Sequence, residues 1–299
     1  MVKYFDEGEV AAALDWGALI AAMERALAAF SLRQVIQPVR QILTVEPERR
    51  MFGVMPAVTG GAMGLKAVSF YPGNEGTALP THMAMIILFR TDTGEPLAAM
   101  DGRLITEMRT AAVSAAVTNR LTPPDAQVLA LLGSGVQAQA HLEALSYVRR
   151  FNDVRVWSRN SAHAERFAKA HGAAAMDAES AVRGADVVVT ATASGRPVLK
   201  GAWLKPGAHV NAVGACLPTW RELDDDVMAN GVVVDSREAA LKESGDVILS
   251  GSEIIAEAGE IFAGVKSIPA SRKTVFKSLG LAVEDIAAAQ LVFEAHQHR

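Results

Sequence analysis

The sequence predicts an α/β protein built on a doubly wound parallel sheet, with a smaller α/β domain ahead of it. Beyond about residue 121, short apolar runs alternate with segments of helical periodicity, as in repeated strand–helix–strand units. Between about 35 and 101, strand-like runs follow one another with only turns between them. This earlier part is therefore expected to form a separate sheet.

Composition indicates a globular protein without a basic surface. The chain has 299 residues, 50% of them hydrophobic, which is enough for two domains. Its net charge of -4 gives no electrostatic basis for binding nucleic acid or an anionic membrane. The single cysteine, Cys216, cannot form an internal disulfide, and the acidic residues Asp6, Glu7 and Glu9 do not fit a signal peptide. We expect a soluble, cytoplasmic protein that binds neither nucleic acid nor membrane.

The first domain is expected to start with a helix over residues 7–30, for which Asp15 is a candidate N-cap. Strands then follow at 39–45, 51–57, 65–70, 82–90 and 96–100, separated by turn-forming residues. The run Met83 to Phe89 is apolar on both faces, so we expect this strand to be covered on both sides.

A helix over residues 103–120 leads through Pro123 and Pro124, where we place the domain boundary. The parallel strands are expected at 128–132, 154–157, 186–190, 209–213 and, last, 232–235, with a helix at 161–171. A final amphipathic helix over 281–297 is expected to return to the first domain. The predicted domains are therefore residues 1–120 completed by 281–299, and residues 121–280.

The first strand of the second domain runs into a glycine turn that is typical of dinucleotide binding. The turn reads G-x-G-x-x-A, with Gly133, Gly135 and Ala138, between an apolar run and a helical pattern. Gly133 permits the tight turn, and Gly135 leaves room for a pyrophosphate at the helix N-terminus. Small residues at such a turn can also serve packing alone, but the flanking strand and helix favour a Rossmann-type cofactor domain.

The end of the second strand of this domain decides between the two nicotinamide dinucleotides. NAD-binding domains usually carry an acidic residue there, whereas this chain reads Trp157, Ser158, Arg159 and Asn160. Arg159 can hold a 2′-phosphate with its fork of donors, the alternative being a solvated surface arginine. Asp153 lies at the opposite end of the strand. We therefore predict NADPH as the cofactor.

Three cations interrupt apolar patterns in the first domain. Arg109 lies on the helix face that should be buried, and Lys66 and Arg40 lie within strand patterns. A buried guanidinium needs an anion, which for Arg109 is either a structural carboxylate or a substrate or cofactor group. Lys66 alone could be a lysine that extends its amine to the surface. Together the three predict a positively charged site, without acidic partners, for a small acidic molecule.

Two further residues have weaker indications. His82 is either a core histidine or a site residue, and no group of His, Cys and Asp has metal-ligand spacing. Cys216 follows a predicted strand at the edge where α/β proteins bind ligands. No histidine lies beside Cys216 in the sequence to activate it, so a nucleophilic role is disfavoured.

Ten segments spread over nearly the whole chain resemble one known family. They are QPVR (37–40), FGVMPA (52–57), LKAVSFY (65–71), MDG (100–102), RTAAVSA (109–115), LLGSGVQA (131–138), PGAHVNAVGA (206–215), WRELDD (220–225), EAALKESGD (238–246) and TVFKSLGLAVED (274–285). This pattern is similar to the ornithine cyclodeaminase/mu-crystallin family. The resemblance implies a homodimer, with an N-terminal dimerisation and substrate domain and a nicotinamide-binding domain in each chain.

The resemblance also implies roles for individual residues. Arg40 and Lys66 match substrate-site cations, and Arg109 matches an arginine that reaches both substrate and cofactor. Cys216 and Glu243 match positions near the bound carboxylate ligand. The positions expected to bind the cofactor are Thr81, His82, Arg109, Gly133, Gly135, Val136, Gln137, Ser158, Arg159, Asn160, Thr190, Thr192, Val213 and Ser278.

Departures from the family narrow the choice of reaction. Ornithine cyclodeaminases carry an aspartate at the position of Cys216 and a glutamate at that of Gly53, so cyclodeamination is disfavoured. The resemblance instead favours NADPH-dependent reduction of cyclic ketimine carboxylates, such as piperideine- or pyrroline-2-carboxylate. Alternatives are an alanine dehydrogenase, a reductive aminase of 2-keto acids, or a non-enzymatic hormone-binding crystallin.

A mechanism follows from this reading. Arg40 and Arg109 would neutralise the substrate carboxylate and hold its C2 near C4 of the nicotinamide. Lys66, with a pKa lowered by the two arginines, would give the imine its proton, the alternative donor being an ordered water.

Overall fold

The structure is a computed structural model that describes residues 2–47 and 49–297. It divides into two compact units, Met1–Arg109 with Gly280–Arg299, and Thr110–Leu279. We call these unit 1 and unit 2. The boundary between them falls inside helix α3 (Arg103–Leu121), ahead of Pro123 and Pro124. The roles expected of the two domains stay predictions.

Unit 1 contains a six-stranded sheet in the order β1-β6-β5-β4-β3-β2. Its strands are β1 (Lys3–Phe5), β2 (Gln41–Glu46), β3 (Arg50–Val58), β4 (Met63–Phe70), β5 (His82–Phe89) and β6 (Pro96–Asp101). Neighbours are antiparallel, except that β1 pairs with β6 in parallel. The five predicted strands are present with shifted ends, while β1 is too short to give a periodic pattern.

The predicted helix over residues 7–30 is two helices, α1 (Glu7–Ala13) and α2 (Trp16–Ser31). Leu14 is extended between them, and the side chain of Asp15 accepts a hydrogen bond from the backbone N of Ala18 at 3.0 Å. The N-cap prediction for Asp15 is therefore confirmed. The prediction of one continuous helix was wrong, because Asp15 caps the start of a second helix.

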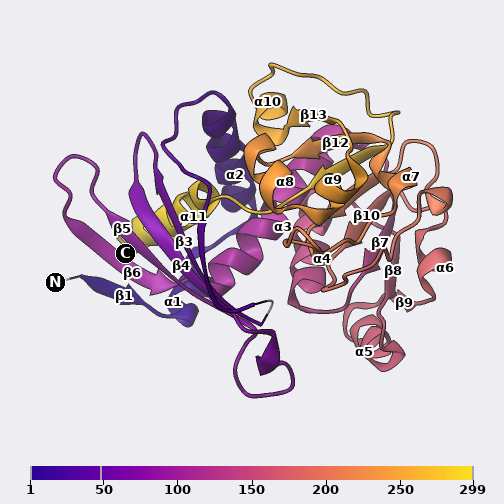
Figure 1. The fold of residues 1–299 in the computed structure, drawn as a ribbon, viewed down its shortest axis with the longest axis horizontal. Helices are drawn as coiled ribbons and strands as arrows, with labels where there is room; N and C mark the ends of the chain where they lie inside the picture. Colours follow the sequence, from indigo (N-terminus) through magenta and orange to yellow (C-terminus); the bar gives the residue numbers. More distant parts are fainter. Residues whose placement is uncertain (1, 48, 298–299) are drawn as a thin grey trace. The chain divides into compact units, whose positions relative to one another are not determined.

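The C-terminal helix α11 (Ala282–Gln297) packs against α2 and against β3, β4 and β5 of the same unit (Figure 1). A side chain at Gly64 of β4 would collide with the backbone oxygen of Ile87 and with Ile286 of α11. Residues 282–286 are all buried. The expected amphipathic pattern is therefore wrong for the first turn of α11, where two acidic residues lie in the interior.

Strand β5 is buried on only one face within the chain. Ile86 and Leu88 are 0% and 2% exposed, whereas Met85, on the opposite face, is 45% exposed. The prediction that this strand is covered on both sides is wrong for the single chain. The outer face of the sheet keeps apolar side chains at its surface.

Unit 2 contains an eight-stranded sheet in the order β13-β12-β14-β11-β10-β7-β8-β9, in which every neighbouring pair is parallel. Its strands are β7 (Val128–Leu132), β8 (Asp153–Trp157), β9 (Ala174–Ala175), β10 (Val187–Thr190), β11 (His209–Ala212), β12 (Gly231–Val234), β13 (Ile254–Glu257) and β14 (Thr274–Lys277). From β7 the chain continues outward to β8 and β9 and then crosses back to β10, on the other side of β7, which is the doubly wound arrangement. The predicted fold class is confirmed. The prediction that 232–235 is the last strand is wrong, because β13 and β14 follow it.

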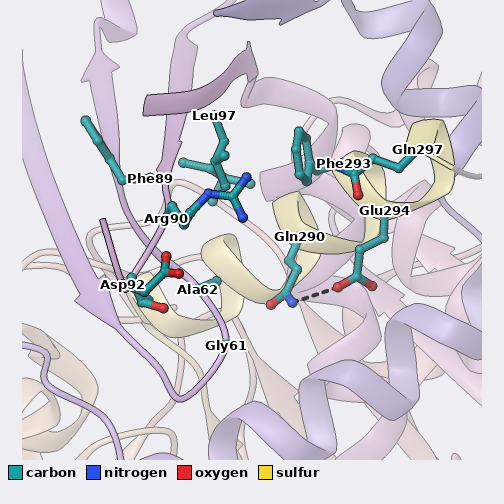
Figure 2. Close-up of a pocket in the computed structure, with 12 residues that line it drawn as sticks. Gly61, Ala62, Phe89, Arg90, Asp92, Leu97, Gln290, Phe293, Glu294 and Gln297 are labelled. Carbon is teal, nitrogen blue, oxygen red and sulfur yellow. Dashed lines mark hydrogen bonds between the residues drawn. The ribbon is translucent and has the colours of Figure 1, made fainter. Parts of the chain in front are cut away.

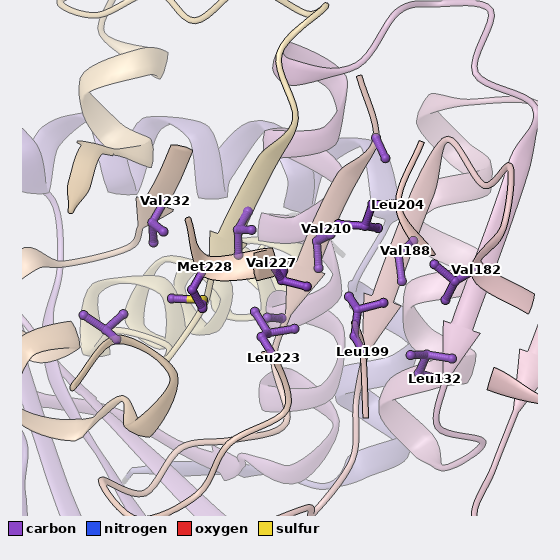
Figure 3. Close-up of a cluster of buried hydrophobic side chains, with 14 of the residues drawn as sticks. Leu132, Val182, Val188, Leu199, Leu204, Val210, Leu223, Val227, Met228 and Val232 are labelled. Carbon is purple, nitrogen blue, oxygen red and sulfur yellow. The ribbon is translucent and has the colours of Figure 1, made fainter. Parts of the chain in front are cut away.

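Helices cover both faces of this sheet. On one face, apolar residues of β7, β10, β11 and β12 pack with those of α6 and α7, as Figure 3 shows for Leu132, Val182 and Val227. On the other face, Asn211 of β11 donates to Thr118 Oγ1 of α3 at 2.9 Å. The other helices of unit 2 are α4 (Val136–Val148), α5 (Ser161–His171), α6 (Ala178–Val182), α7 (Asp225–Met228), α8 (Arg237–Glu243), α9 (Gly245–Ser250) and α10 (Ala258–Phe262). Short 3-10 turns lie at Gly201–Trp203 in unit 2 and at Pro72–Asn74 in unit 1.

Membrane-spanning helices are absent from the described part of the chain, since none of its helices combines the required length and apolar character.

Candidate functional site

The glycine turn of unit 2 has the geometry that the sequence motif requires. Gly133 has a φ of +126°, and a side chain there would collide with the backbone oxygen of Ala191. At Gly135, the N-cap of α4, a side chain would have nothing within 4 Å. Gly135 is thus not needed for packing, and its lack of a side chain leaves space in front of the helix N-terminus. Ala138 is 1% exposed and packs beneath the turn.

Two buried polar atoms at the carboxyl edge of the unit 2 sheet fit a bound dinucleotide. Gln137 Oε1, in the first turn of α4, and Ser278 Oγ, directly after β14, are buried without a hydrogen-bond partner among the described residues. Buried polar atoms in folded proteins nearly always have partners, so such atoms indicate a ligand. Both lie at the carboxyl ends of parallel strands, where α/β proteins bind nucleotides. These residues fit a nicotinamide dinucleotide.

The residues after β8 leave an exposed cation. Asn160 Oδ1 accepts from the backbone N of Ala162 at 3.0 Å and caps α5, so it is engaged in the fold. Arg159 is exposed, and within the described ranges no carboxylate lies at ion-pair distance from it. Asp153 pairs with Arg155 at 2.7 Å at the other end of the strand. Arg159 is therefore available for an anionic group, with Ser158 next to it in the chain.

The loops that follow β10 and β11 carry three predicted cofactor positions. The backbone N of Val213 donates to the carbonyl of Thr190 at 2.9 Å, which joins the two strand ends. Thr192 donates through both its N and its Oγ1 to Glu222, each at 2.7 Å. Glu222 lies within the family-like segment at 220–225, but no role was predicted for it.

Unit 1 contains a buried cluster of charged side chains. Lys66 of β4 is 2% exposed, and its Nζ lies 2.7 Å from Asp285 Oδ2. Arg109 of α3 is 4% exposed and donates from Nε to Asp285 Oδ1 at 2.9 Å and from Nη1 to Glu284 Oε2 at 2.8 Å. Asp285 thus connects the two cations.

This arrangement corrects one prediction. Lys66 and Arg109 were expected to lack acidic partners, yet α11 supplies Glu284 and Asp285, both 0% exposed. The structural carboxylate left open for Arg109 is present. The sequence contained an indication of this carboxylate, because Glu284 and Asp285 directly precede the apolar run Ile286-Ala-Ala-Ala of a predicted helix. Acidic residues that are buried within an apolar helix need charged partners.

The charges around Lys66 have opposing effects on its pKa. Burial lowers the pKa of Lys66, Asp285 raises it, and Arg109 and Arg40 lower it, with the result at about 8. Burial alone would raise the pKa of Asp285, but Arg109 and Lys66 outweigh burial and hold it below its usual value. At neutral pH the lysine is protonated and the aspartate ionised. The predicted lowering of the Lys66 pKa is present, although burial is its largest cause.

Arg40 lies one residue before β2, not within a strand as predicted. Its Nη2 donates to the carbonyl of Gly280 at 2.6 Å. Gly280 has a φ of +78°, and a side chain there would collide with the guanidinium of Arg109. Arg40 and Arg109 therefore both lie next to Gly280, the residue that leads into α11. The three predicted substrate-site cations are close together in unit 1.

His82 begins β5, on the same face of the sheet as Lys66. Its ring packs against Phe70 with ring centroids 4.5 Å apart, and its Nδ1 lies 3.3 Å from Thr81 Oγ1. Neighbouring groups and the charge of Lys66 both lower the pKa of His82, although the residue is exposed at the surface. The imidazole is thus neutral at physiological pH.

Cys216 and Glu243 belong to unit 2. Cys216 is half-buried in the loop after β11, and Glu243 is the half-buried last residue of α8. Their proposed substrate roles stay predictions.

A cavity of about 410 Å³ lies at the C-terminal end of α11, between this helix and the turns at residues 61–62 and 89–92 (Figure 2). Gln290, Phe293 and Glu294 line one side of it, and Arg90 lines another. None of its lining residues is a predicted site residue. The cavity is therefore distinct from the charged cluster on β4 and α3.

A parallel doubly wound sheet with a glycine turn at its centre defines a dinucleotide-binding protein. The sequence profile of the ornithine cyclodeaminase/mu-crystallin family matches residues 1–299. A ketimine reductase mu-crystallin from Mus musculus is 49% identical over 286 residues, which cover 93% of this chain and 91% of that protein. The chain belongs to the ornithine cyclodeaminase/mu-crystallin family.

Solved structures agree with this assignment. The Δ1-pyrroline-2-carboxylate reductase of Thermococcus litoralis, in complex with NADH and L-proline, has a TM-score of 0.94 and 34% identity, covering 100% of this chain and 98% of that one. An archaeal alanine dehydrogenase dimer with bound NAD has a TM-score of 0.93 and 33% identity, covering 99% of this chain and 96% of that one.

Proposed function

We propose that this protein reduces cyclic ketimine carboxylates, of the piperideine-2-carboxylate or pyrroline-2-carboxylate type, to cyclic amino acids with NADPH. The observation that carries the proposal is the buried cluster in which Lys66, with a pKa of about 8, lies beside Asp285 and Arg109. The relatives support it, because a ketimine reductase and a pyrroline-2-carboxylate reductase are similar over nearly the whole chain. The bound dinucleotide would supply the hydride.

The charge balance of the cluster favours an anionic substrate. Lys66, Arg40 and Arg109 carry three positive charges, and Glu284 and Asp285 carry two negative ones. A buried site with one surplus positive charge is stabilised by a single carboxylate. Arg40 and Arg109 are the proposed carboxylate ligands, because guanidinium groups bind carboxylates through paired hydrogen bonds.

Lys66 is the proposed proton donor to the imine nitrogen. A general acid is most effective when its pKa lies near the working pH, and a pKa of about 8 keeps Lys66 protonated but able to release its proton. Asp285 Oδ2, at 2.7 Å, holds the ammonium in one orientation. Asp285 also favours the return of a proton to Lys66 after each turnover.

The preference for NADPH is proposed on the residues after β8. Arg159 is exposed without a carboxylate partner in the described part of the chain, and Ser158 is adjacent to it. The residues that would hold the rest of the dinucleotide are Gly133, Gly135, Val136, Gln137, Asn160, Thr190, Thr192, Val213 and Ser278. Thr81 and His82 of unit 1 are proposed to contribute as well.

A homodimer is proposed on the outer face of the unit 1 sheet. Tyr4, Leu43, Phe52 and Met85 lie on this face with 52%, 59%, 37% and 45% of their surface exposed. Contiguous exposed apolar residues on a sheet typically mark a protein–protein interface. The alanine dehydrogenase relative is described as a dimer.

The test is a steady-state panel that follows NADPH or NADH oxidation at 340 nm. We expect reduction of piperideine-2-carboxylate and pyrroline-2-carboxylate, with a higher kcat/KM for NADPH. Pyruvate with ammonia or methylamine forms the second arm, and higher turnover there would favour an alanine dehydrogenase or reductive aminase. Binding of NADPH without turnover of any compound would contradict the proposal and favour a ligand-binding protein.

A further inference from the structure

The unit 2 sheet holds a buried carboxylate that belongs to no predicted site. We propose that Glu222 is a positioning residue that holds the loops after β10 and β11 in the form that binds the nicotinamide half of the cofactor. This inference rests on the proposed use of a nicotinamide dinucleotide and names a residue that strengthens the binding of that cofactor.

Glu222 is 0% exposed and accepts five hydrogen bonds. Its Oε1 accepts from N and Oγ1 of Thr192, each at 2.7 Å. Its Oε2 accepts from Thr190 Oγ1 at 2.9 Å, from Gly214 N at 2.8 Å and from Ala215 N at 3.2 Å. One carboxylate therefore joins the segment after β10 to the segment after β11.

The two segments lie too close together for any side chain between them. A side chain at Gly214 would collide with the backbone of Thr192 and with Glu222 Oε1. Glycine at this position thus lets the loops come within reach of one carboxylate. The carboxylate in turn satisfies backbone N–H groups that lie beyond the strands.

The backbone of Glu222 is held in place by Asp246, which forms a buried ion pair with Lys277. Asp246 Oδ1, at the start of α9, accepts from the backbone N of Glu222 at 2.8 Å and of Leu223 at 3.0 Å. Its Oδ2 lies 3.2 Å from Nζ of Lys277, at the end of β14. Asp246 and Lys277 are both 0% exposed. The network therefore reaches the carboxyl ends of three adjacent strands, β10, β11 and β14.

The position in the sheet indicates which half of the cofactor this network serves. In a doubly wound sheet a dinucleotide crosses the point where the strand order reverses, which here lies between β7 and β10. The acidic or basic residue that contacts the adenosine ribose follows the second strand, β8, on one side of β7. The loops held by Glu222 lie on the other side, so they face the nicotinamide half.

Glutamine cannot replace this carboxylate. Three of the five groups on Glu222 are backbone N–H donors, one facing Oε1 and two facing Oε2, so the amide nitrogen of Glu222→Gln would face at least one of them whichever way it turns. We expect the variant to lose order in both loops. A loss of about tenfold or more in NADPH affinity is the size expected when buried donors lose a charged acceptor.

The experiment compares wild type with Glu222→Gln and with Glu253→Gln, an exposed glutamate of the same unit. The dissociation constants of NADPH and of adenosine 2′,5′-bisphosphate, which carries only the adenosine half, are measured by fluorescence and calorimetry. We expect NADPH binding to weaken about tenfold or more in Glu222→Gln, with the bisphosphate constant within about twofold of wild type. The Glu253→Gln protein should match wild type in both.

Two results would overturn the inference. One is an unchanged NADPH constant in Glu222→Gln, and the other is an equal loss for both ligands, which would indicate a purely structural role. If Glu222→Gln does not fold, Thr190→Val removes one donor to the carboxylate at nearly constant volume and should weaken NADPH binding by a smaller factor, again with the bisphosphate constant unchanged. A wild-type protein that binds no NADPH would overturn the cofactor proposal and this inference together.

Discussion

The proposed role of Lys66 as a general acid sets two opposing requirements. Its side chain must be desolvated to lower the pKa into a useful range, yet enough negative charge must remain nearby to keep it protonated. Burial lowers the pKa, and Asp285 at 2.7 Å raises it, which together with the arginines gives a value of about 8. Without Asp285 the pKa of Lys66 would be lower still, and less of the lysine would carry a proton to donate.

The pH dependence of turnover follows from this value. The acid must be protonated, so kcat should fall as pH rises through about 8. Lys66→Met should lose ~10²-fold or more in kcat, the usual contribution of a general acid, and should lack this descending limb. The check is kcat between pH 6 and pH 10 with a saturating cyclic imine (the range is set by the pKa of Lys66, roughly two units on either side).

A matched variant separates charge from proton donation. Lys66→Arg keeps the positive charge beside Asp285, but the pKa of an arginine lies far above the working range, so the variant should bind substrate yet turn over slowly. Wild-type kcat in Lys66→Met, with the same pH limb, would remove Lys66 from the role of acid and leave an ordered water as the donor.

Local patterns predicted most of the elements, because their signals are contained in neighbouring residues. The strand at 128–132, an apolar run of five residues, and the helix at 161–171 were predicted with the observed bounds. Strand β14 was missed because it ends in Lys277, a charged residue that is buried there beside Asp246. Tertiary charge pairing of this kind has no local signature.

The two glycines of the β7–α4 turn differ in what they do, and substitution should separate them. The methyl group added in Gly135→Ala would have no atom within 4 Å, so the melting temperature of this variant should stay close to that of wild type. Its affinity for NADPH should fall about tenfold or more. Gly133→Ala collides with Ala191 at a φ of +126° and should lower both stability and affinity. Thermal unfolding and NADPH titration of both variants are the measurements. Wild-type NADPH affinity in Gly135→Ala would contradict a phosphate site at this turn.

At the scale of the whole chain, the candidate site could be predicted only in part. The three cations were found because each interrupted an apolar pattern. The acidic residues that neutralise them come from α11, and both lie more than 170 positions after Arg109 in the sequence. Only the fold brings Glu284 and Asp285 to β4 and α3. The consequence is a site that retains one surplus positive charge instead of three.

The outer face of the unit 1 sheet carries the last prediction, which concerns assembly. Pairing places Met85 opposite Ala67, which in turn lies opposite Val54, and the adjacent outward row is Met83, Ser69 and Phe52. Met85 is 45% exposed near the middle of this face. A second copy seated there would bury these side chains, and a charge at Met85 would then have to be desolvated.

We therefore expect the wild-type protein to be a dimer in solution. Met85→Arg should shift the equilibrium toward monomer. Its dimer dissociation constant should rise ~10²-fold or more, because an unpaired buried charge costs several kcal/mol. Light scattering on a size-exclusion column over a range of protein concentrations makes the measurement. Leu249→Arg, at a residue of α9 that is 55% exposed, is the matched control and should remain dimeric. A wild-type monomer, or a Met85→Arg dimer of undiminished affinity, would mean that this face of the sheet is not the interface.

Adenosine 2′,5′-bisphosphate binding should persist in the Met85→Arg monomer, because the glycine turn and Arg159 belong to unit 2, whose sheet and core are its own.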